Sequence, residues 1–184
     1  MTNTDKVRFI EIPRPLQGNG VRYGAAVGAI LRELEDSFYE YDAQHSPHVE
    51  IRARLERVAC SELSDLQLFK RAFHHSCTRA TLMMVNGEPV GVCMTSRWSK
   101  DQVTFWNFCV SSKHRGKGYG KLLMQHNIDM HSKLGYRSMN LYVHGANTKA
   151  YAMYEEFGFK PLQVEMHLTL EKPHVQRDAE ASAC

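Results

Sequence analysis

Residues 110–121 form a glycine-rich, basic stretch whose residue types are suited to holding an anion. Gly116, Gly118 and Gly120 alternate with other residues, and glycine lets a backbone approach a ligand closely. The stretch lies between a β-prone run and a helical pattern, and the start of a helix favours negative charge. We therefore predict a pyrophosphate-binding loop; the alternative is a tight turn with a solvated basic face. Four cations and no acid lie within residues 111–121: Lys113, Arg115, Lys117 and Lys121.

The spacing of these glycines does not fit two common phosphate-binding loops. A P-loop needs a glycine five residues before Gly120, where the sequence has Arg115. It also needs a hydroxyl residue after Lys121, where the sequence has Leu122. The dinucleotide-binding fingerprint needs a third glycine at position 121, which is this same lysine. What remains is the pattern Arg-x-x-Gly-x-Gly after an apolar strand.

A second signature lies downstream of this loop. It consists, in order, of Asn147, Ala150, Tyr154, Gly158 and Phe159. With Arg-x-x-Gly-x-Gly upstream, this order and spacing resemble the GCN5-related N-acetyltransferase (GNAT) superfamily. The resemblance covers residues 80–170, while the first 75 residues match only in their general helical character.

The resemblance implies that acetyl-CoA lies in an opening between two splayed parallel strands, here 102–110 and 138–144. It implies that main-chain groups of three consecutive residues form hydrogen bonds with the pantetheine arm: Phe108, Cys109 and Val110. It assigns the pyrophosphate to Arg115, Gly116, Lys117, Gly118, Tyr119, Gly120 and Lys121. Asn147 would contact the cofactor and cap the next helix. Tyr154 matches the tyrosine that protonates the leaving thiolate, a role that a neutral phenol can fill.

The strand over residues 102–110 contains no carboxylate, although this family often uses a glutamate there to deprotonate the amine. The general base is therefore unassigned. Asn107 is a candidate for positioning a water, and Cys109 is interpreted as a buried small hydrophobe rather than a nucleophile. Two functions stay open: an N-acetyltransferase that transfers directly from acetyl-CoA to a primary amine, and a non-enzymatic sensor or assembly module that binds acetyl-CoA or CoA.

Residues 31–50 carry the opposite local charge, with six acids against one base. In the family, the region joining the first two helices lies over the acceptor site. Tyr39, Glu40 and Asp42 would attract a cationic amine there by charge and cation–π contact. The alternative is a solvated helix face above buried aromatics. The predicted acceptor is a small cationic amine or a peptide or protein amine, because the second signature also resembles that of N-terminal acetyltransferases.

Hydrophobic periodicity predicts the element order βααβββαβαβ, an α/β fold with a mixed sheet. The predicted strands are 7–12, 80–85, 90–96, 102–110, 138–144 and 162–170. The predicted helical regions are 21–40, 51–59, a stretch from the capping box of Ser64 and Gln67 to 73, a helix from the glycine loop to 134, and 147–157. Asn86-Gly87 predicts a hairpin turn, and Gly135 is placed to end the helix before it. With the resemblance, this gives a single-domain, GNAT-like sheet of six to seven strands and about four helices. The domain would span 1–170, with 1–78 on the acceptor side, 79–170 as the cofactor-binding core, and 171–184 as a polar tail.

The composition is that of an ordinary globular chain, with 184 residues, 43% hydrophobic residues and a net charge of +3. This charge is too small, and the basic stretch too short, to indicate nucleic-acid binding. The five cysteines form no CxxC and the ten histidines show no ligand spacing, so neither a disulfide framework nor a metal site is expected. Because no segment resembles a signal peptide or membrane span, we expect a cytoplasmic protein acting on an amine; a homodimer stays open.

Overall fold

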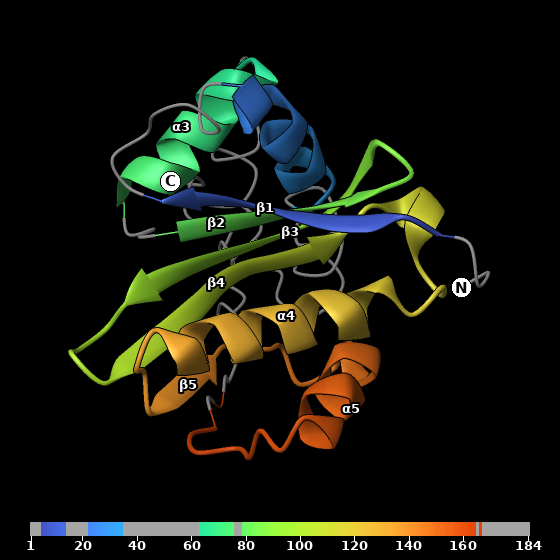
Figure 1. The fold of residues 1–184 in the computed structure, drawn as a ribbon. Coiled ribbons are helices and arrows are strands. Elements are labelled where there is room, and N and C mark those ends of the chain that lie inside the picture. The colour runs from blue at the N-terminus through green and yellow to red at the C-terminus, as the bar shows by residue number, and fades with distance from the viewer. Residues whose placement is uncertain (1–4, 14–21, 35–62, 76–78, 165, 167–184) are drawn as a thin grey trace, which may run out of the picture.

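Five β-strands form one mixed sheet, which is the framework of the molecule (Figure 1). The computed structural model describes residues 5–13, 22–34, 63–75, 79–164 and 166. Its strands are β1 (Val7–Pro13), β2 (Arg79–Val85), β3 (Glu88–Arg97), β4 (Gln102–Val110) and β5 (Ser138–Leu141). Neighbours from β1 to β4 are antiparallel, and β5 is parallel to β4. The predicted mixed α/β sheet is confirmed, although the described residues contain five strands rather than six to seven.

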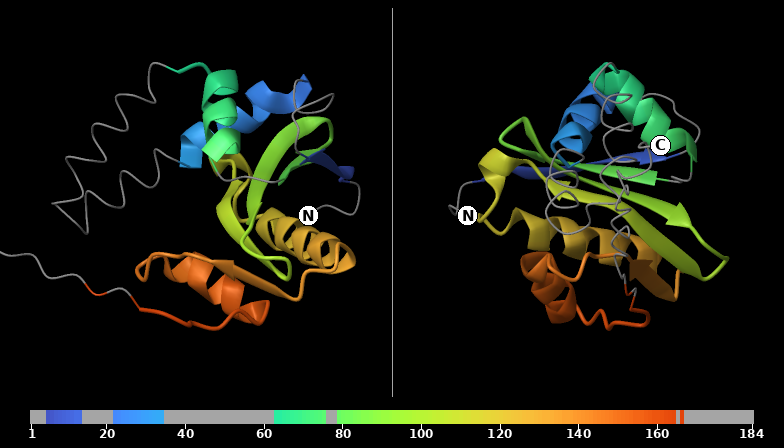
Figure 2. Two further views of the ribbon diagram at one scale, coloured as in Figure 1. Left: turned by 90° about the vertical axis from the view of Figure 1, so that its left-hand side faces the viewer. Right: turned by 180° about the vertical axis from the view of Figure 1, so that it is seen from behind.

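Helices cover both faces of this sheet (Figure 2). A helix over residues 22–34 and α3 (Asp65–His75) lie on one face. On the other face lies α4 (Tyr119–Lys133), with α5 (Thr148–Glu156) packed beside it after β5. A short 3₁₀ helix, η1 (Ser112–His114), joins β4 to the glycine loop. The four α-helices within the described residues match the number predicted.

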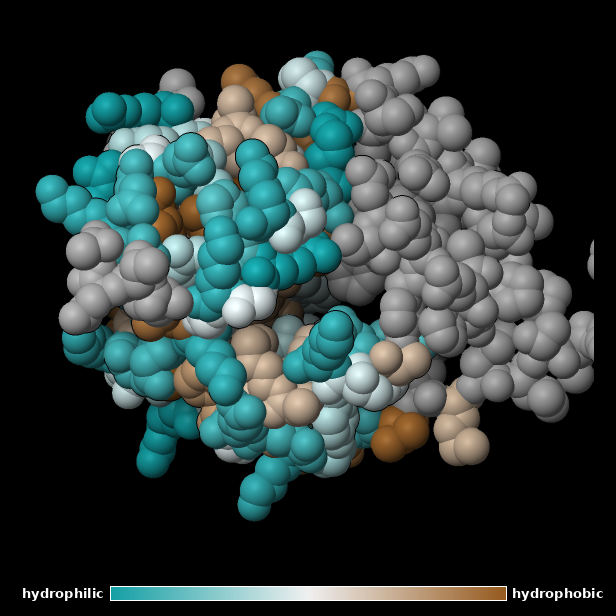
Figure 3. All heavy atoms as spheres, turned by 90° about the vertical axis from the view of Figure 1, so that its right-hand side faces the viewer, coloured by the Kyte–Doolittle hydropathy of each residue, from teal (hydrophilic) through white to brown (hydrophobic). Residues whose placement is uncertain are grey.

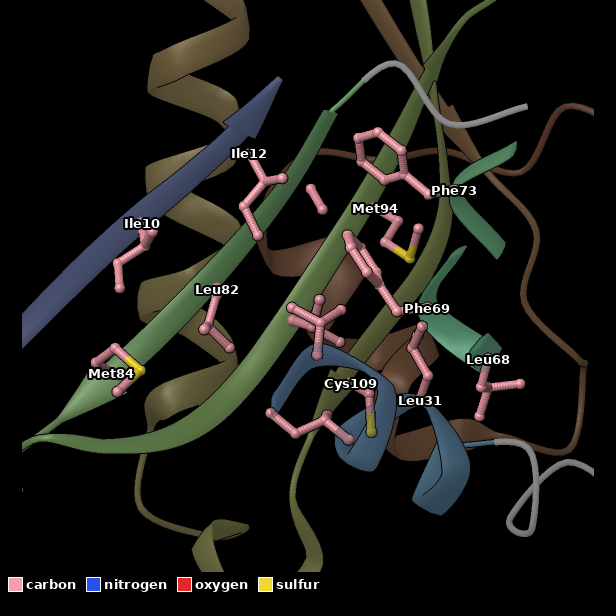
Figure 4. Packing of buried hydrophobic residues seen from close by; sticks show 14 residues of the cluster. Ile10, Ile12, Leu31, Leu68, Phe69, Phe73, Leu82, Met84, Met94 and Cys109 are labelled. Carbon is pink, nitrogen blue, oxygen red and sulfur yellow. The ribbon is translucent and has the colours of Figure 1, made fainter. Parts of the chain in front are cut away.

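The face below residues 22–34 and α3 is packed with apolar side chains (Figure 4). Its labelled members are Ile10, Ile12, Leu31, Leu68, Phe69, Phe73, Leu82, Met84, Met94 and Cys109. The two helices approach closely, because a Cβ on Gly28 would lie only 1.7 Å from the main-chain oxygen of Asp65. Arg32 locks the pair: its Nε donates to Asp65 Oδ1 at 2.9 Å, and its Nη2 donates to the Leu63 carbonyl at 2.6 Å.

The α4 face has its own apolar cluster and, in addition, a chain of buried hydrogen bonds. Asn127 accepts from the Thr81 hydroxyl at 3.1 Å and donates to the Leu123 carbonyl at 2.8 Å. One turn on, His131 Nδ1 lies 2.8 Å from the Asn127 carbonyl, and Nε2 lies 3.1 Å from the Thr95 hydroxyl. A carbonyl only accepts, so Nδ1 carries the proton and Nε2 accepts from Thr95.

Local signals in the sequence set several element boundaries, as predicted. Ser64 and Gln67 form a reciprocal capping box at the start of α3: Ser64 N–H donates to Gln67 Oε1 at 2.8 Å, and Gln67 N–H donates to Ser64 Oγ at 3.4 Å. Asn86 and Gly87 both have positive φ and make the turn between β2 and β3. Gly135, with φ of 88°, ends α4.

Two predicted strands differ from the structure. The strand predicted over 138–144 ends at Leu141, because β5 and β4 no longer pair beyond that residue. The alternation over 162–170 predicts a last strand, but residues 162–164 and 166 are not in one. Their apolar side chains face solvent: Leu162 is 91%, Val164 78% and Met166 91% exposed. Alternation favours a strand only where a partner strand covers its apolar side.

Several other predictions concern segments outside the described residues. These are the helical regions over 35–40 and 51–59, the rest of the 162–170 strand and the polar tail over 171–184. The division of one domain at residue 78 stays a prediction as well. Among the helices that the structure describes, none is both long and apolar enough to cross a membrane.

Candidate active site

Strand β5 pairs with only the first part of β4, and it ends where this pairing ends. The parallel ladder runs from Gln102 opposite Ser138 to Phe105 opposite Leu141. Strand β4 continues to Val110 without a β5 partner, although it stays paired with β3. On the β3 side the register shifts around position 106, and such a bulge bends a strand. On the β5 side, β4 therefore has an edge over residues 106–110 that no described strand covers, at the place where the splayed opening is predicted.

The loop after this opening has the geometry of an anion-binding turn. Gly116 and Gly118 have φ of 77° and 82°, and no atom lies within 4 Å of the position a Cβ would take at either. Gly118 is the N-cap of α4, and the first intrahelical bond runs from Leu122 N–H to its carbonyl at 3.3 Å. The N–H groups of residues 118–121 thus lack intrahelical acceptors. Donors at the start of a helix, preceded by two glycines with open space around them, suit a pyrophosphate.

The side chains around the loop divide into two groups. Arg115 and Lys117 project from it, and Arg115 Nε also donates to the Val110 carbonyl at 2.9 Å. Lys121 pairs with Glu156 of α5, and the buried Tyr119 donates its hydroxyl to Asp5 at 2.9 Å. At positions 119 and 121 the side chains are therefore paired within the chain, and the predicted role is left to the backbone N–H groups. Direct contact of these residues with a cofactor stays a prediction.

Asn147 has the predicted capping role. It is the N-cap of α5, and its Oδ1 accepts from the Ala150 N–H at 3.3 Å. Its backbone N–H donates to the His144 carbonyl at 2.8 Å, which closes the turn after β5. This turn leads from β5 into α5. The predicted contact of Asn147 with the cofactor is not tested by this geometry.

Tyr154 reaches from α5 to the separated part of β4. Its ring packs edge-on against Phe108 at a centroid distance of 6.4 Å and against Phe159 at 5.9 Å. Burial, and to a smaller extent the nearby thiols of Cys93 and Cys109, raises the pKa of Tyr154 to about 12. The phenol is therefore protonated at neutral pH and is able to donate a proton beside β4.

Two further predicted residues of β4 contact the apolar cluster below the helix over 22–34. Cys109 is buried in the apolar cluster of that face, and its burial raises the pKa of the thiol. It is thus packed as a small hydrophobe, as predicted, and its chemistry is that of an inert thiol. Asn107 is half-buried, and its Nδ2 donates to Met94 Sδ at 3.7 Å.

Sequence reasoning did not single out Glu33, which counted only as one acid in a charged segment. The carboxylate accepts from the Ser111 hydroxyl at 2.9 Å and from the Ser112 N–H at 2.7 Å. These residues directly follow β4, so an acid of the helical layer contacts the start of the predicted cofactor loop. No local spacing rule joins residues this far apart in sequence, and only the fold brings them together.

The acceptor side is described less completely. Tyr39, Glu40 and Asp42 lie outside the described residues. Where β4 and β5 separate, however, Trp106 and Tyr142 form an aromatic pair with ring centroids 6.3 Å apart, and they are 47% and 73% exposed. Exposed aromatics at this point are a feature that sequence reasoning also missed, because a β-prone run gives no sign of which side chain a bulge turns outward.

A hollow of about 570 Å³ lies on the other side of the glycine loop. It is lined by Asp5, Val85, Asn86, Glu88, His114, Lys117 and Tyr119. None of these residues belongs to β4 or β5, and acids and bases are mixed in its wall. The surface on which β4 ends and α4 begins is largely hydrophilic (Figure 3). The opening between β4 and β5, rather than this hollow, contains Tyr154 and is the candidate active site.

The model of the acetyltransferase (GNAT) family matches residues 29–159. This chain therefore belongs to the GNAT acetyltransferase family, as its two motifs predicted. The described residues contain no group of three or more His, Cys, Asp or Glu side chains arranged to hold a metal ion.

Among curated proteins, the chain is 36% identical over 59 residues to the ribosomal protein bS18-alanine N-acetyltransferase of Escherichia coli. That match covers 32% of this chain and 40% of the relative's length. Among solved structures, the YycN protein of Bacillus subtilis has a TM-score of 0.62 at 18% identity, over 90% of this chain and 100% of that one. An aminoglycoside acetyltransferase from an uncultured soil metagenomic sample, in complex with sisomicin, has a TM-score of 0.58 at 10% identity, over 90% and 97%. At these identities the structures share the fold alone.

Proposed function

We propose that this protein is an N-acetyltransferase that moves an acetyl group from acetyl-CoA to a primary amine by direct transfer. One observation carries the proposal: Tyr154 packs against Phe108 on the part of β4 that has no β5 partner. This puts a proton donor beside an unpaired strand edge, and that edge leads directly into an anion-binding loop. Family membership supports the same activity.

The chain's backbone would provide most of the cofactor contacts. The unpaired edge of β4 over residues 108–110 would take the pantetheine arm as an added strand. The N–H groups of residues 118–121 would hold the pyrophosphate, and Arg115 and Lys117 would add positive charge beside it. Asn147 would contact the cofactor from the start of α5.

The transfer forms a bond from the amine nitrogen to the acetyl carbonyl carbon and breaks the bond from that carbon to sulfur. Tyr154 donates its hydroxyl proton to the leaving sulfur and regains one from solvent. With a pKa of about 12, it is in the donating form throughout the neutral range. The ammonium releases one proton to a water, which Asn107 would position because β4 has no carboxylate, and the nitrogen releases a second proton to solvent as the amide forms.

The acceptor we propose is a cationic amine, either a small molecule or the amine of a peptide or protein. The E. coli relative is named for an alanine of a ribosomal protein, which supports a peptide amine. Glu40, Asp42 and Tyr39 would attract the ammonium group before it loses its proton. The exposed rings of Trp106 and Tyr142 at the opening would add an aromatic surface for the same cation.

The first experiment measures release of free thiol from acetyl-CoA with a panel of polyamines, aminoglycosides and peptides that begin with alanine. We expect turnover with at least one acceptor. Tyr154→Phe should lower kcat about 100-fold or more, because it removes the general acid. The dissociation constant for CoA should stay within about twofold, since backbone groups provide most of its contacts.

Tyr151→Phe is the matched control, because it removes a hydroxyl from the same helix three residues away. This variant should keep its kcat. Tight binding of CoA without turnover on the whole panel would favour the alternative function, a sensor or assembly module. An unchanged kcat in Tyr154→Phe would remove this tyrosine from the chemical step.

A further inference from the structure

Glu33 joins the helical layer over residues 22–34 to the segment that follows β4. Its Oε1 accepts from the Ser111 hydroxyl at 2.9 Å, and its Oε2 accepts from the Ser112 N–H at 2.7 Å. Both carboxylate oxygens are therefore used by two consecutive residues of one turn. Two hydrogen bonds to one carboxylate set both the orientation of the turn relative to the helix over 22–34 and its distance from that helix.

This contact replaces a cap that η1 does not have. Ser111 is the N-cap of η1, but it makes no side-chain capping bond, and its hydroxyl points to Glu33 instead. N–H groups at the start of a helix need an external acceptor, and Glu33 provides one for Ser112. The start of η1 thus depends on a residue of another layer.

Glu33 is a carboxylate in this arrangement. Burial alone would raise its pKa, but the hydrogen bonds from Ser112 and Ser111 and the nearby Arg115 guanidinium outweigh burial and lower it. Hydrogen bonds to an ionised acceptor are stronger than those between neutral groups. A carboxylate held in this way is a weak base, so Glu33 does not fill the unassigned role of general base.

The helix that carries Glu33 is itself held firmly. Arg32, the residue before it, bonds to Asp65 and Leu63 at the start of α3. The close approach at Gly28 leaves this helix little room to shift relative to α3. Glu33 therefore acts from a fixed support, which a positioning role requires.

From Ser112 the chain passes through η1 to Arg115, whose Nε returns to the Val110 carbonyl at 2.9 Å. The turn that Glu33 holds is thus the base of the glycine loop. We propose that Glu33 is a positioning residue that orders the cofactor loop before acetyl-CoA binds. This inference rests on the proposed acetyl-CoA function. A loop that is already ordered loses little conformational entropy when the cofactor binds. Its affinity is therefore higher than that of a loop that must become ordered on binding.

The test uses the full chain and Glu33→Gln, which keeps the size of the side chain and removes its charge. In the protein without CoA, we measure hydrogen exchange of the amides over residues 112–118. By calorimetry we measure the Kd for CoA. We expect faster exchange and a Kd weakened about tenfold, while kcat at saturating acetyl-CoA stays within about twofold. A side chain that merely stabilised the fold would not separate affinity from kcat in this way.

Glu88→Gln is the matched control. It removes the same charge beside the same loop, where Glu88 is 3.8 Å from His114 but holds no backbone group in place. Both its exchange rates and its Kd should match the wild type. If Glu33→Gln fails to fold, Ser111→Ala removes one of the two contacts and should weaken the Kd in the same direction.

The two proposals fail in different ways. If Glu33→Gln, or in its place Ser111→Ala, leaves both loop exchange and the Kd for CoA unchanged, the positioning role is wrong. If the wild type does not bind CoA at all, the proposed function is wrong, and exchange over residues 112–118 still decides whether Glu33 orders the loop. Faster loop exchange in Glu33→Gln but not in Glu88→Gln supports the role.

Discussion

The two faces of the sheet are packed in different ways. Below residues 22–34 and α3, a large apolar cluster is buried, and the two helices come close enough for glycine to be needed at position 28. On the α4 face, apolar packing is combined with buried hydrogen bonds through Thr81, Asn127, His131 and Thr95. The stability of the first face depends on close packing. The stability of the α4 face depends on close packing and also on the protonation state of His131.

The two faces therefore have different parts in the proposed function. The apolar face fixes the helix that carries Glu33, and such packing does not respond to pH. The α4 face supports Tyr154, the proposed proton donor, and the N–H groups at the start of α4. We therefore expect substitutions on the first face to act mainly on stability, and changes on the second to act on pH dependence and on cofactor binding.

The largest effect on the apolar face is expected from Gly28→Ala. The new Cβ would lie 1.7 Å from the main-chain oxygen of Asp65, so the helix over 22–34 must move away from α3. Overpacking against backbone should lower the free energy of unfolding by about 3 kcal/mol or more. Denaturant unfolding at constant pH measures this loss. The gain in helix propensity from glycine to alanine is about 1 kcal/mol and does not offset it.

Gly24→Ala is the matched control for this prediction. Its Cβ would meet the side chains of Leu66 at 2.7 Å and Phe69 at 2.8 Å, and side chains can rotate aside. The loss should therefore be clearly smaller than at Gly28. Equal unfolding midpoints for the two variants would contradict the close backbone approach.

On the α4 face, we expect stability to fall as the pH drops below about 6.5. Burial lowers the pKa of His131; Arg79 and His126 act in the same direction, while the Asn127 carbonyl and Glu11 oppose them. Below the ordinary histidine pKa near 6.5, the unfolded chain binds a proton that the folded chain does not. Unfolding is thus favoured at low pH, by at most about 1.4 kcal/mol per pH unit for one proton. Above pH 6.5 this contribution to stability is complete.

Denaturant unfolding between pH 5 and 8 tests this, with His131→Gln as the comparison. Glutamine can donate to the Asn127 carbonyl and has no titration in this range. The slope between pH 5 and 6.5 should therefore be shallower in the variant. Other histidines and acids contribute equally to both proteins, so the difference in slope isolates position 131. Equal slopes of unfolding free energy against pH in the two proteins would mean that groups other than His131 cause the pH dependence.

The sequence predicted the elements whose signals are local. The capping box at Ser64, the Asn86-Gly87 turn and the glycine after α4 all lie within a few residues of the boundary that they set. The same holds for the N-cap Asn147, whose side chain bonds three residues ahead. The predicted strand over 162–170 shows the limit at its described residues, 162–164 and 166, which are not in a strand, because a strand needs a distant partner that alternation does not specify.

For the candidate site, the two motifs predicted the loop and the position of Tyr154, but not how side chains are shared with the rest of the fold. Cofactor binding by the main-chain N–H groups of Tyr119 and Lys121 stays a prediction, but the sequence did not predict that their side chains pair with Asp5 and Glu156. Each partner is distant in sequence, and choice among distant partners is decided by tertiary packing. Glu33 was missed for the same reason.

The smallest expected effect concerns Lys121, whose ion pair with Glu156 lies at the surface of the α4 face. Such a pair contributes at most about 1 kcal/mol to stability, so Glu156→Gln should leave the unfolding free energy nearly unchanged. It releases the ammonium at the start of α4, where the anion would bind. We expect the KM for acetyl-CoA to fall about twofold at low salt, and this gain to vanish at high salt.

Glu155→Gln is the control, because it removes an equal charge from the neighbouring exposed position of the same helix. Both variants change the long-range field of the protein equally, so a fall in KM confined to Glu156→Gln reports the release of Lys121. A fall in KM of equal size in both variants would mean that the change in net charge, and not the release of Lys121, causes it. A rise in KM for Glu156→Gln would mean that Glu156 holds Lys121 where the cofactor needs it, and that the ion pair belongs to the binding site rather than competing with it.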